Sequence, residues 1–503
     1  MEKVTPFDIP LLINEICQYL SLRDLRHCVL VSKTWAAWFT PVLWRDLTCR
    51  RRTPDIPALT RQQEHIRIVR NISMLSALFI RERLPFLQLQ RLEFDDDYDA
   101  DGAHRAEIRV LPLLERIRSL QHLGIKLSLD RDNIYQQCIR TLGALPHLES
   151  VCLRCEQFID GKVIQGILLV CHRLERLSII FSKSELYVVE EDLQGYMDTR
   201  AEIQRMPEMR LRELSFSSDS HLVMENILQP LLERCPRIEK LDLGYETTDS
   251  TIWHLSKLLK ENNFPRLRHL VAGGGRVKGY FQEAMAEVLS HVECGLESLE
   301  FVDSPSEPVI QSLVQYHSRM TKLDFSGYEI SLWNLSDLMA GLPNLRSFES
   351  EVSSDYVRSS RDIPFDQHWE CVSLKNLRLH LDGWDSSDTT EHERKGSRVR
   401  LFLDYMFSEL AKLTRLQELF IECSLRNLFF KRHGYLTRLA DLKQIKVFNF
   451  GKISDDRESG KEEALWMVEN WPRLLEVHIP QMDEFDEVLL EKRPLIEVLH
   501  KNY

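Results

Sequence analysis

The hexamer Leu174-Glu175-Arg176-Leu177-Ser178-Ile179 carries the pattern that decides the fold of this chain. Apolar residues stand at its first, fourth and sixth positions, and polar residues stand between them. Successive side chains of a strand point to opposite faces, so Leu177 and Ile179 share one face and Ser178 takes the other. The hexamer therefore predicts a short strand that is buried on one side.

The same template, with other apolar residues allowed, recurs in 14 copies at a mean spacing of about 30 residues. This regular spacing predicts an array of repeats. The copies are 89–94, 120–125, 148–153, 174–179, 211–216, 238–243, 267–272, 296–301, 320–325, 345–350, 374–379, 416–421, 442–447 and 474–479.

Amphipathic segments lie between the predicted strands, and apolar residues recur in them at helical spacing. Thr251–Asn262, Tyr280–Val292 and Val399–Leu413 are three predicted helices of this kind. A single strand and helix cannot bury their apolar faces alone, whereas stacked units share one continuous core. The sequence therefore predicts an α/β solenoid.

The array resembles leucine-rich-repeat proteins over roughly residues 84–480. The resemblance implies short parallel strands on a concave face and helices on a convex face, with partners bound on the strand side. The Asn or Cys that usually follows the strand is mostly absent, and Glu246 stands there after Leu241-Asp242-Leu243. We therefore expect irregular repeats.

Composition fits one array better than the three or four globular domains that 503 residues would otherwise suggest. Leu occupies 77 positions, while Gly and Pro occupy 19 each, so few linkers are expected. The net charge of -12 argues against a nucleic-acid partner. Eleven scattered cysteines, and the lack of a signal peptide or spanning segment, predict a cytoplasmic and/or nuclear protein with no membrane partner.

A different pattern precedes the array at residues 7–47. Apolar residues at helical spacing follow Ile9-Pro10, and Ser21 and Asp24 offer capping oxygens for a second helix. A unit of about 40 residues can hardly bury so many apolar side chains alone. We therefore expect part of its surface to meet a partner or the start of the solenoid.

This segment resembles an F-box. The matching residues, in family order, are Ile9-Pro10, Ile16, Leu20, Asp24-Leu25, Cys28, Val31-Ser32-Lys33 and Trp35. Phe39-Thr40-Pro41 and Leu43-Trp44 also look like fungal F-box proteins, while the usual acidic residue after Pro10 is replaced by Leu11 and Leu12.

The resemblance implies a three-helix module that docks on a Skp-type adaptor and, through it, on the cullin of an SCF-type ubiquitin ligase. It assigns the apolar anchor, or the residues that keep the helices in shape, to Pro10, Ile16, Leu20, Leu25, Val31 and Trp35. The predicted domains are an F-box at 1–47, a basic linker or start of the solenoid at 48–83, and the repeat array at 84–503.

Chemistry-bearing motifs are weak in this sequence. The turn at 273–279 is glycine-rich and carries Arg276 and Lys278, but its spacing fits no phosphate-binding motif, so a turn within one repeat is the better interpretation. Cys152 and Cys155 have no second pair at zinc spacing and are read as structural thiols. We predict no catalytic residue, no metal site and no cofactor.

The template also predicts which side chains lie on the open strand face. This face is slightly basic in the first four repeats and acidic further along, which suits a basic protein segment; unselected surface charge is an equally good interpretation. The candidate residues are Asp242, Glu300, Asp324, Glu349, Glu418, Phe420, Glu422 and Phe448.

These patterns favour a non-catalytic substrate receptor of a cullin–RING ubiquitin ligase, with the array holding an unknown target protein. The alternatives are a protein-interaction scaffold whose F-box acts outside any ligase, and an enzyme that uses the turn at 273–279.

Overall fold

The computed structural model separates into two compact units, residues 1–238 and 239–503. It describes residues 10–48, 61–72, 88–94, 114, 117–127, 132–155, 161–181, 193–218, 220–244, 247–273, 280–293, 295–353, 367–382, 392–423, 434–450, 460–479 and 483–500.

The first unit begins with three helices, α1 (Pro10–Gln18), α2 (Leu22–Val31) and α3 (Lys33–Leu43). Ser21 caps α2 as the sequence predicts: the Asp24 amide donates to Ser21 Oγ at 3.2 Å, and the Ser21 amide donates to Asp24 Oδ2 at 3.1 Å. The Ser21 hydroxyl also donates to Asp24 and holds the pKa of this carboxyl below its ordinary value. Ser32 then ends α2 and caps α3 through the Trp35 amide.

A small apolar core joins the three helices. Its fully buried residues are Ile13, Cys17, Leu25 and Phe39, with the Trp35 and Phe39 ring centroids 5.3 Å apart. Further apolar residues pack against this core while remaining partly exposed: Leu20, Cys28, Val29, Trp35, Trp38, Val42 and Leu43.

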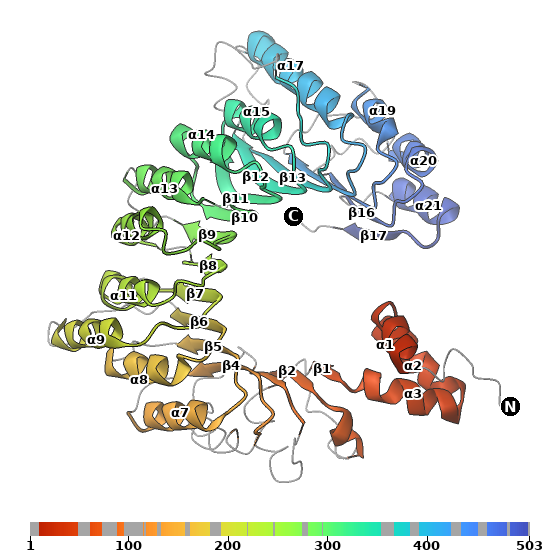
Figure 1. The fold of residues 1–503 in the computed structure, drawn as a ribbon. Coiled ribbons are helices and arrows are strands. Elements are labelled where there is room, and N and C mark those ends of the chain that lie inside the picture. Colours follow the sequence, from red (N-terminus) through yellow and green to blue (C-terminus); the bar gives the residue numbers. More distant parts are fainter. Residues whose placement is uncertain are drawn as a thin grey trace. The chain divides into compact units, whose positions relative to one another are not determined.

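A parallel ladder of seven strands follows in the first unit, with helices along one side of it (Figure 1). Its strands are β1 (Asp46–Thr48), β2 (Ile68–Ile72), β3 (Arg91–Phe94), β4 (His122–Leu127), β5 (Ser150–Cys155), β6 (Arg176–Phe181) and β7 (Glu213–Ser217). The helical segments are η2 (Gln63–His65), α7 (Asp132–Ala144), α8 (Gly161–Cys171), α9 (Leu193–Arg205), α10 (His221–Val223), η4 (Met224–Leu228) and α11 (Gln229–Glu233).

The strand ladder begins before the first copy of the repeat template. The sequence leaves residues 48–83 as either a basic linker or the start of the solenoid, and β1 and β2 pair in parallel here, with Leu47 opposite Val69, which favours the second reading. Only Trp44 and Arg45 separate α3 from β1, and the Arg45 carbonyl accepts hydrogen bonds from the Arg67 and Ile68 amides at 3.1 and 2.9 Å. The strand ladder therefore continues directly from the helical module.

The second unit repeats the same strand-and-helix order in ten strands, again with the helices on one face (Figure 1). The strands are β8 (Lys240–Asp242), β9 (His269–Gly273), β10 (Ser298–Val302), β11 (Lys322–Ile330), β12 (Ser347–Ser353), β13 (Asn376–Asp382), β14 (Glu418–Cys423), β15 (Val447–Phe450), β16 (Glu476–Ile479) and β17 (Glu497–His500). The helices are α12 (Asp249–Lys260), α13 (Tyr280–His291), α14 (Glu307–Tyr316), α15 (Leu332–Gly341), α17 (His392–Leu410), α19 (Tyr435–Arg438), η5 (Leu439–Asp441), α20 (Gly460–Asn470) and α21 (Asp483–Lys492).

Aligned template residues form the core of the second unit. Leu270, Leu299 and Leu323 stand opposite one another on β9, β10 and β11, and all three are buried. Aromatic packing extends the same core across the strands: Phe301 stacks on Phe281 with ring centroids 5.8 Å apart and meets Phe325 edge-on at 6.1 Å. The α/β solenoid predicted from the hexamer is thereby confirmed, including α12, α13 and α17 over the three predicted helical segments.

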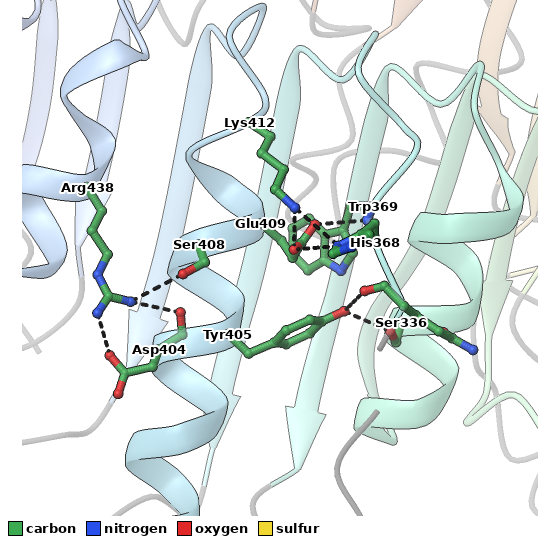
Figure 2. Close-up of polar contacts among 10 residues, drawn as sticks. Ser336, His368, Trp369, Asp404, Tyr405, Ser408, Glu409, Lys412 and Arg438 are labelled. Atoms are coloured by element: carbon green, nitrogen blue, oxygen red, sulfur yellow. Dashed lines mark hydrogen bonds and ion pairs between the residues drawn. The ribbon is translucent and has the colours of Figure 1, made fainter. Parts of the chain in front are cut away.

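Helix α17 also holds the segment before β13 through polar contacts (Figure 2). Tyr405 donates a hydrogen bond to the Gln367 carbonyl at 2.6 Å and bonds Ser336 on α15 at 3.0 Å. Arg438 on α19 pairs with Asp404 at 2.8 Å. These contacts connect three neighbouring repeats through their helices.

Candidate binding surfaces

The helical module exposes an unusual amount of apolar side chain on α1, α2 and the turn between them. Tyr19 is 84% exposed, Leu30 is 81% exposed and Val31 is 62% exposed. Exposed apolar surface that is gathered on one small module marks an interaction site. We call these residues the α1–α2 apolar face: Leu12, Ile16, Tyr19, Leu22, Leu30 and Val31.

The six predicted adaptor-binding residues divide between this face and the core. Ile16 and Val31 lie on the exposed face. Leu25 is buried in the core, so of the two predicted roles it has that of keeping the helices in shape. Leu20 and Trp35 pack against the same core, and Pro10 is the first residue of α1, where proline is well tolerated. The side chain of Pro10 is outside the described part of the chain.

The sequence analysis did not assign Tyr19, Leu22 and Leu30 to this face. Tyr19 lies at the end of α1 and Leu30 near the end of α2, away from the stripe that Ile13, Cys17 and Leu25 bury. The sequence signal for these residues is an apolar side chain at a helix position outside the apolar stripe that the helix buries. This signal requires the helix bounds, because a shift of one residue rotates the stripe by about 100°.

A row of aligned side chains follows the strand face of the second unit, opposite the helices. Register places one residue of each strand in this row, and neighbouring strands lie about 4.8 Å apart. We call it the central row: Asp242, Val271, Glu300, Asp324, Glu349, Arg378, Phe420, Asn449, His478 and Leu499.

Five of the eight predicted face residues belong to the central row, and four of these are the carboxylates Asp242, Glu300, Asp324 and Glu349. Glu418 and Glu422 flank the fifth, Phe420, on β14. Four of the five strands from β8 to β12 place a carboxylate at this register, and β9 places Val271 there, so the central row is acidic over these strands.

Local contacts partly satisfy the acidic row. The Ser326 amide donates to Asp324 Oδ1 at 3.0 Å, and Lys322 lies 3.6 Å from the same carboxylate, which is only 9% exposed as a residue. The Gly244 amide donates to Asp242 Oδ1 at 3.0 Å. These two carboxylates are therefore held in place, and Asp324 is the most buried of the four.

Phe420 sits where the acidic row gives way to aromatic and basic side chains. The Arg378 guanidinium lies 4.4 Å from the centroid of the Phe420 ring, in cation–π geometry, and 3.7 Å from Glu349. On the other side, the His478 ring centroid is 5.8 Å from that of Phe420. His380 pairs with Glu422 at 2.9 Å. This part of the face combines planar rings with carboxylates.

Phe448 does not belong to the strand face, and its prediction there is wrong. Register aligns it with Leu419 and Val477, both core residues, and it is fully buried against Trp471 at 4.9 Å between ring centroids. The repeat frame in this unit starts at Ile445 and not at Leu442, a shift of three residues. Leu442, Ile445 and Phe448 are spaced three residues apart, so the template can begin at either Leu442 or Ile445.

The remaining motifs provide no reactive group in the described chain. Burial raises the pKa of the Cys152 and Cys155 thiols, which disfavours the nucleophilic and metal-binding thiolate. Gly273 ends β9, and the rest of the turn at 273–279 lies outside the described residues. Within the described ranges, no group of His, Cys, Asp and Glu has the arrangement of a metal site. No helix there is long and apolar enough to span a membrane.

Comparison with known proteins identifies the helical module. The family model of the F-box domain matches residues 7–45. A crystal structure of the Rad7 and Elc1 complex in yeast is 13% identical over 89% of this chain and 86% of that chain, with a TM-score of 0.43. LegL7, a leucine-rich repeat-containing protein from Legionella pneumophila, is 12% identical over 59% of this chain and 97% of that chain, with a TM-score of 0.36. No curated protein matches the chain significantly.

The helical module at the start of the chain is thus matched by the F-box domain, and a parallel strand-and-helix array follows it.

Proposed function

We propose that this chain is the non-catalytic substrate-recognition subunit of an SCF-type cullin–RING ubiquitin ligase. Its F-box domain binds a Skp-type adaptor, which connects it to a cullin, and its repeat array binds the target protein. The observation that carries the proposal is the α1–α2 apolar face within a matched F-box domain. Among the described residues of the F-box, four are buried while six large apolar residues stay exposed, so a partner helix or groove would cover them.

Covering that face provides enough free energy for a stable contact. Tyr19, Leu30 and Val31 are each more than 60% exposed, and full burial of such a side chain is worth about 1.5–3 kcal/mol. The contribution of Leu25, Leu20 and Trp35 is indirect. They pack in or against the core and so fix the positions of the helices that carry the face. The array then raises the effective concentration of a bound target at the ligase without any reaction on this chain.

Capture of a purified Skp-type adaptor by the full chain tests the proposal. The double variant Leu30→Glu/Val31→Glu places two charges on the apolar face, and we expect it to weaken binding at least tenfold, because a buried unpaired carboxylate is costly. Leu495→Glu is the matched control, since Leu495 is 91% exposed but lies outside the F-box. Circular dichroism of each variant confirms that helices and strands are retained.

Two results would contradict this proposal. Equal capture of the adaptor by the wild type and the double variant would remove the α1–α2 apolar face as the contact. Failure of the wild type to bind any Skp-type adaptor would favour the scaffold that acts outside a ubiquitin ligase.

A further inference from the structure

Asn449 is an unsatisfied buried polar residue on the strand face of the second unit. It belongs to the central row, between Phe420 on β14 and His478 on β16. The residue is 3% exposed, and its Oδ1 atom accepts no hydrogen bond. A buried acceptor without a partner is unfavourable, so a ligand that donates a hydrogen bond to Asn449 would be favoured at this site.

Two rings cover Asn449. Phe420 and His478 are two strands apart, which separates their backbones by roughly 9–10 Å. Their ring centroids are nevertheless only 5.8 Å apart, so the rings lean toward each other across β15. Rotation of the His478 side chain, which is 17% exposed, would uncover Asn449.

Carboxylates complete the surroundings in the adjacent row. Register places Glu418 and Glu476 on either side of Val447, two residues before Phe420 and His478 on the same strands. We call four side chains the Asn449 frame: Phe420 and His478, which stand beside Asn449 in register, and Glu418 and Glu476, which stand beside Val447 two residues before it. Glu476 hydrogen-bonds the His478 ring, which holds the ring in its covering position.

The chemistry of the frame selects one kind of ligand. Asn449 Oδ1 needs a donor, Glu418 and Glu476 favour a positive charge, and the Phe420 ring favours a flat cation. The ring already stacks one guanidinium, that of Arg378, and Glu349 balances the charge of that group. Arginine satisfies all three requirements, since its guanidinium is planar, always charged and rich in donors.

We propose that the Asn449 frame binds an arginine side chain of the target protein. The guanidinium displaces the His478 ring, lies beside Phe420, donates to Asn449 Oδ1 and pairs with Glu418 and Glu476. This inference rests on the proposed function, because it gives the substrate class for the array: a basic, arginine-containing segment that lies across the strands.

Fluorescence anisotropy with short labelled glycine–serine peptides tests the inference on the full chain. The peptides carry arginine, lysine, glutamine or glutamate at the same position. We expect the arginine peptide to bind at least tenfold more tightly than the glutamate peptide, with binding that weakens as salt is added. Equal binding of the glutamate peptide would overturn the inference.

Substitution of Asn449 separates binding from a structural role. Asn449→Leu removes the unpaired acceptor, so we expect a higher melting temperature together with at least a tenfold loss of arginine-peptide affinity. Asn449→Asp keeps the acceptor, so we expect it to retain binding. Asn376→Leu, on the same face at β13, is the control that keeps both affinity and selectivity. Unchanged affinity in Asn449→Leu, or a lower melting temperature in that variant, would overturn the inference.

The adaptor experiment distinguishes the two proposals. Loss of peptide selectivity with intact adaptor capture rejects the arginine site alone. Loss of adaptor capture with intact peptide binding rejects the ligase role alone, because the peptides are tested without adaptor.

Discussion

Glu409 on α17 accepts a hydrogen bond of 3.0 Å from the backbone amide of Trp369, which lies 40 residues earlier in the chain (Figure 2). Lys412 donates to the same carboxylate at 2.6 Å, and the Glu409 side chain is only 4% exposed. Burial raises the pKa of Glu409, but the hydrogen bonds from Lys412, the Trp369 amide and His368 outweigh it and keep the pKa below its ordinary value of 4.5. The carboxylate therefore fastens the segment before β13 in its charged form.

Loss of this carboxylate should destabilise the second unit. Glu409→Ala leaves the Trp369 amide unpaired, and we expect a cost of about 3 kcal/mol, compared with about 1 kcal/mol for Glu409→Gln, which keeps an acceptor. Because the folded pKa is depressed, the contribution is complete above about pH 4.5 and disappears as the pH falls through the folded pKa. Urea unfolding from pH 7 to pH 3.5 measures this. A difference between wild type and Glu409→Ala that stays constant with pH would contradict it.

His317 should make folding sensitive to mild acid. It is fully buried, accepts a hydrogen bond from the Leu296 amide at Nδ1 and donates from Nε2 to the Leu289 carbonyl, both at 2.9 Å. Burial lowers its pKa from 6.5 to about 4, so the folded ring stays neutral while the unfolded ring takes up a proton. Stability is therefore complete above pH 6.5 and falls between pH 6.5 and about 4.

We expect a loss of about 2 kcal/mol between pH 7.5 and pH 5 from His317 alone. Urea midpoints at these two pH values measure it, and His317→Gln should show a smaller difference between them. Identical pH dependence of wild type and variant would exclude His317 as the source.

Gly341 at the end of α15 should not tolerate a methyl group. A Cβ atom at this position would overlap Val314 Cγ1 on α14, too close for the two helices to keep their packing. We expect Gly341→Ala to lower the melting temperature and Gly341→Ala/Val314→Ala to recover part of the loss. Gly143→Ala is the control, since its Cβ would meet Val170 at an ordinary 3.8 Å. Additive effects of the two substitutions in a double-mutant cycle would show that the contact is unimportant.

Leu25 and Leu30 should respond in opposite ways although both are leucines of α2. Leu25 is 5% exposed, so Leu25→Ala removes core packing and should cost about 2–5 kcal/mol of F-box stability. Leu30 is 81% exposed, so Leu30→Ala should leave the fold unchanged and weaken only adaptor capture. Hydrogen-exchange rates of the backbone amides of α1 to α3 measure the stability of the F-box. Loss of protection in Leu30→Ala would place this residue in the core.

The sequence predicts the repeated fold well because its signal is redundant. Leu177, Leu214 and Leu323 occupy equivalent template positions, and each is buried as expected. Strand β2 escapes the template because Asn71 stands two residues after Val69, at the position that should be apolar. Phe448 is misplaced for the opposite reason, since apolar residues at 442, 445 and 448 allow two frames and only strand pairing decides between them.

The candidate surfaces are less predictable, because they depend on packing between helices and strands. The F-box motif locates the module, but which of Ile16, Leu25 and Val31 faces outward depends on how α1, α2 and α3 pack. The acidic row follows from strand alternation and is therefore readable. Asn449 carries no motif, and its lack of a partner is visible only once Phe420 and His478 are seen to meet above it.

The two residues between α3 and β1 limit how far the F-box and the first repeats can move relative to each other in the proposed receptor. The connection is only two residues long, and the Arg45 carbonyl within it accepts hydrogen bonds from the Arg67 and Ile68 amides, so this joint does not permit free rotation. A bound adaptor would therefore hold the first repeats at a fixed angle. The position of a target lysine relative to the ligase, and not free motion of the target, would then determine which lysine is modified. A flexible spacer inserted after Trp44 would remove this restriction and make the choice of target lysine less specific.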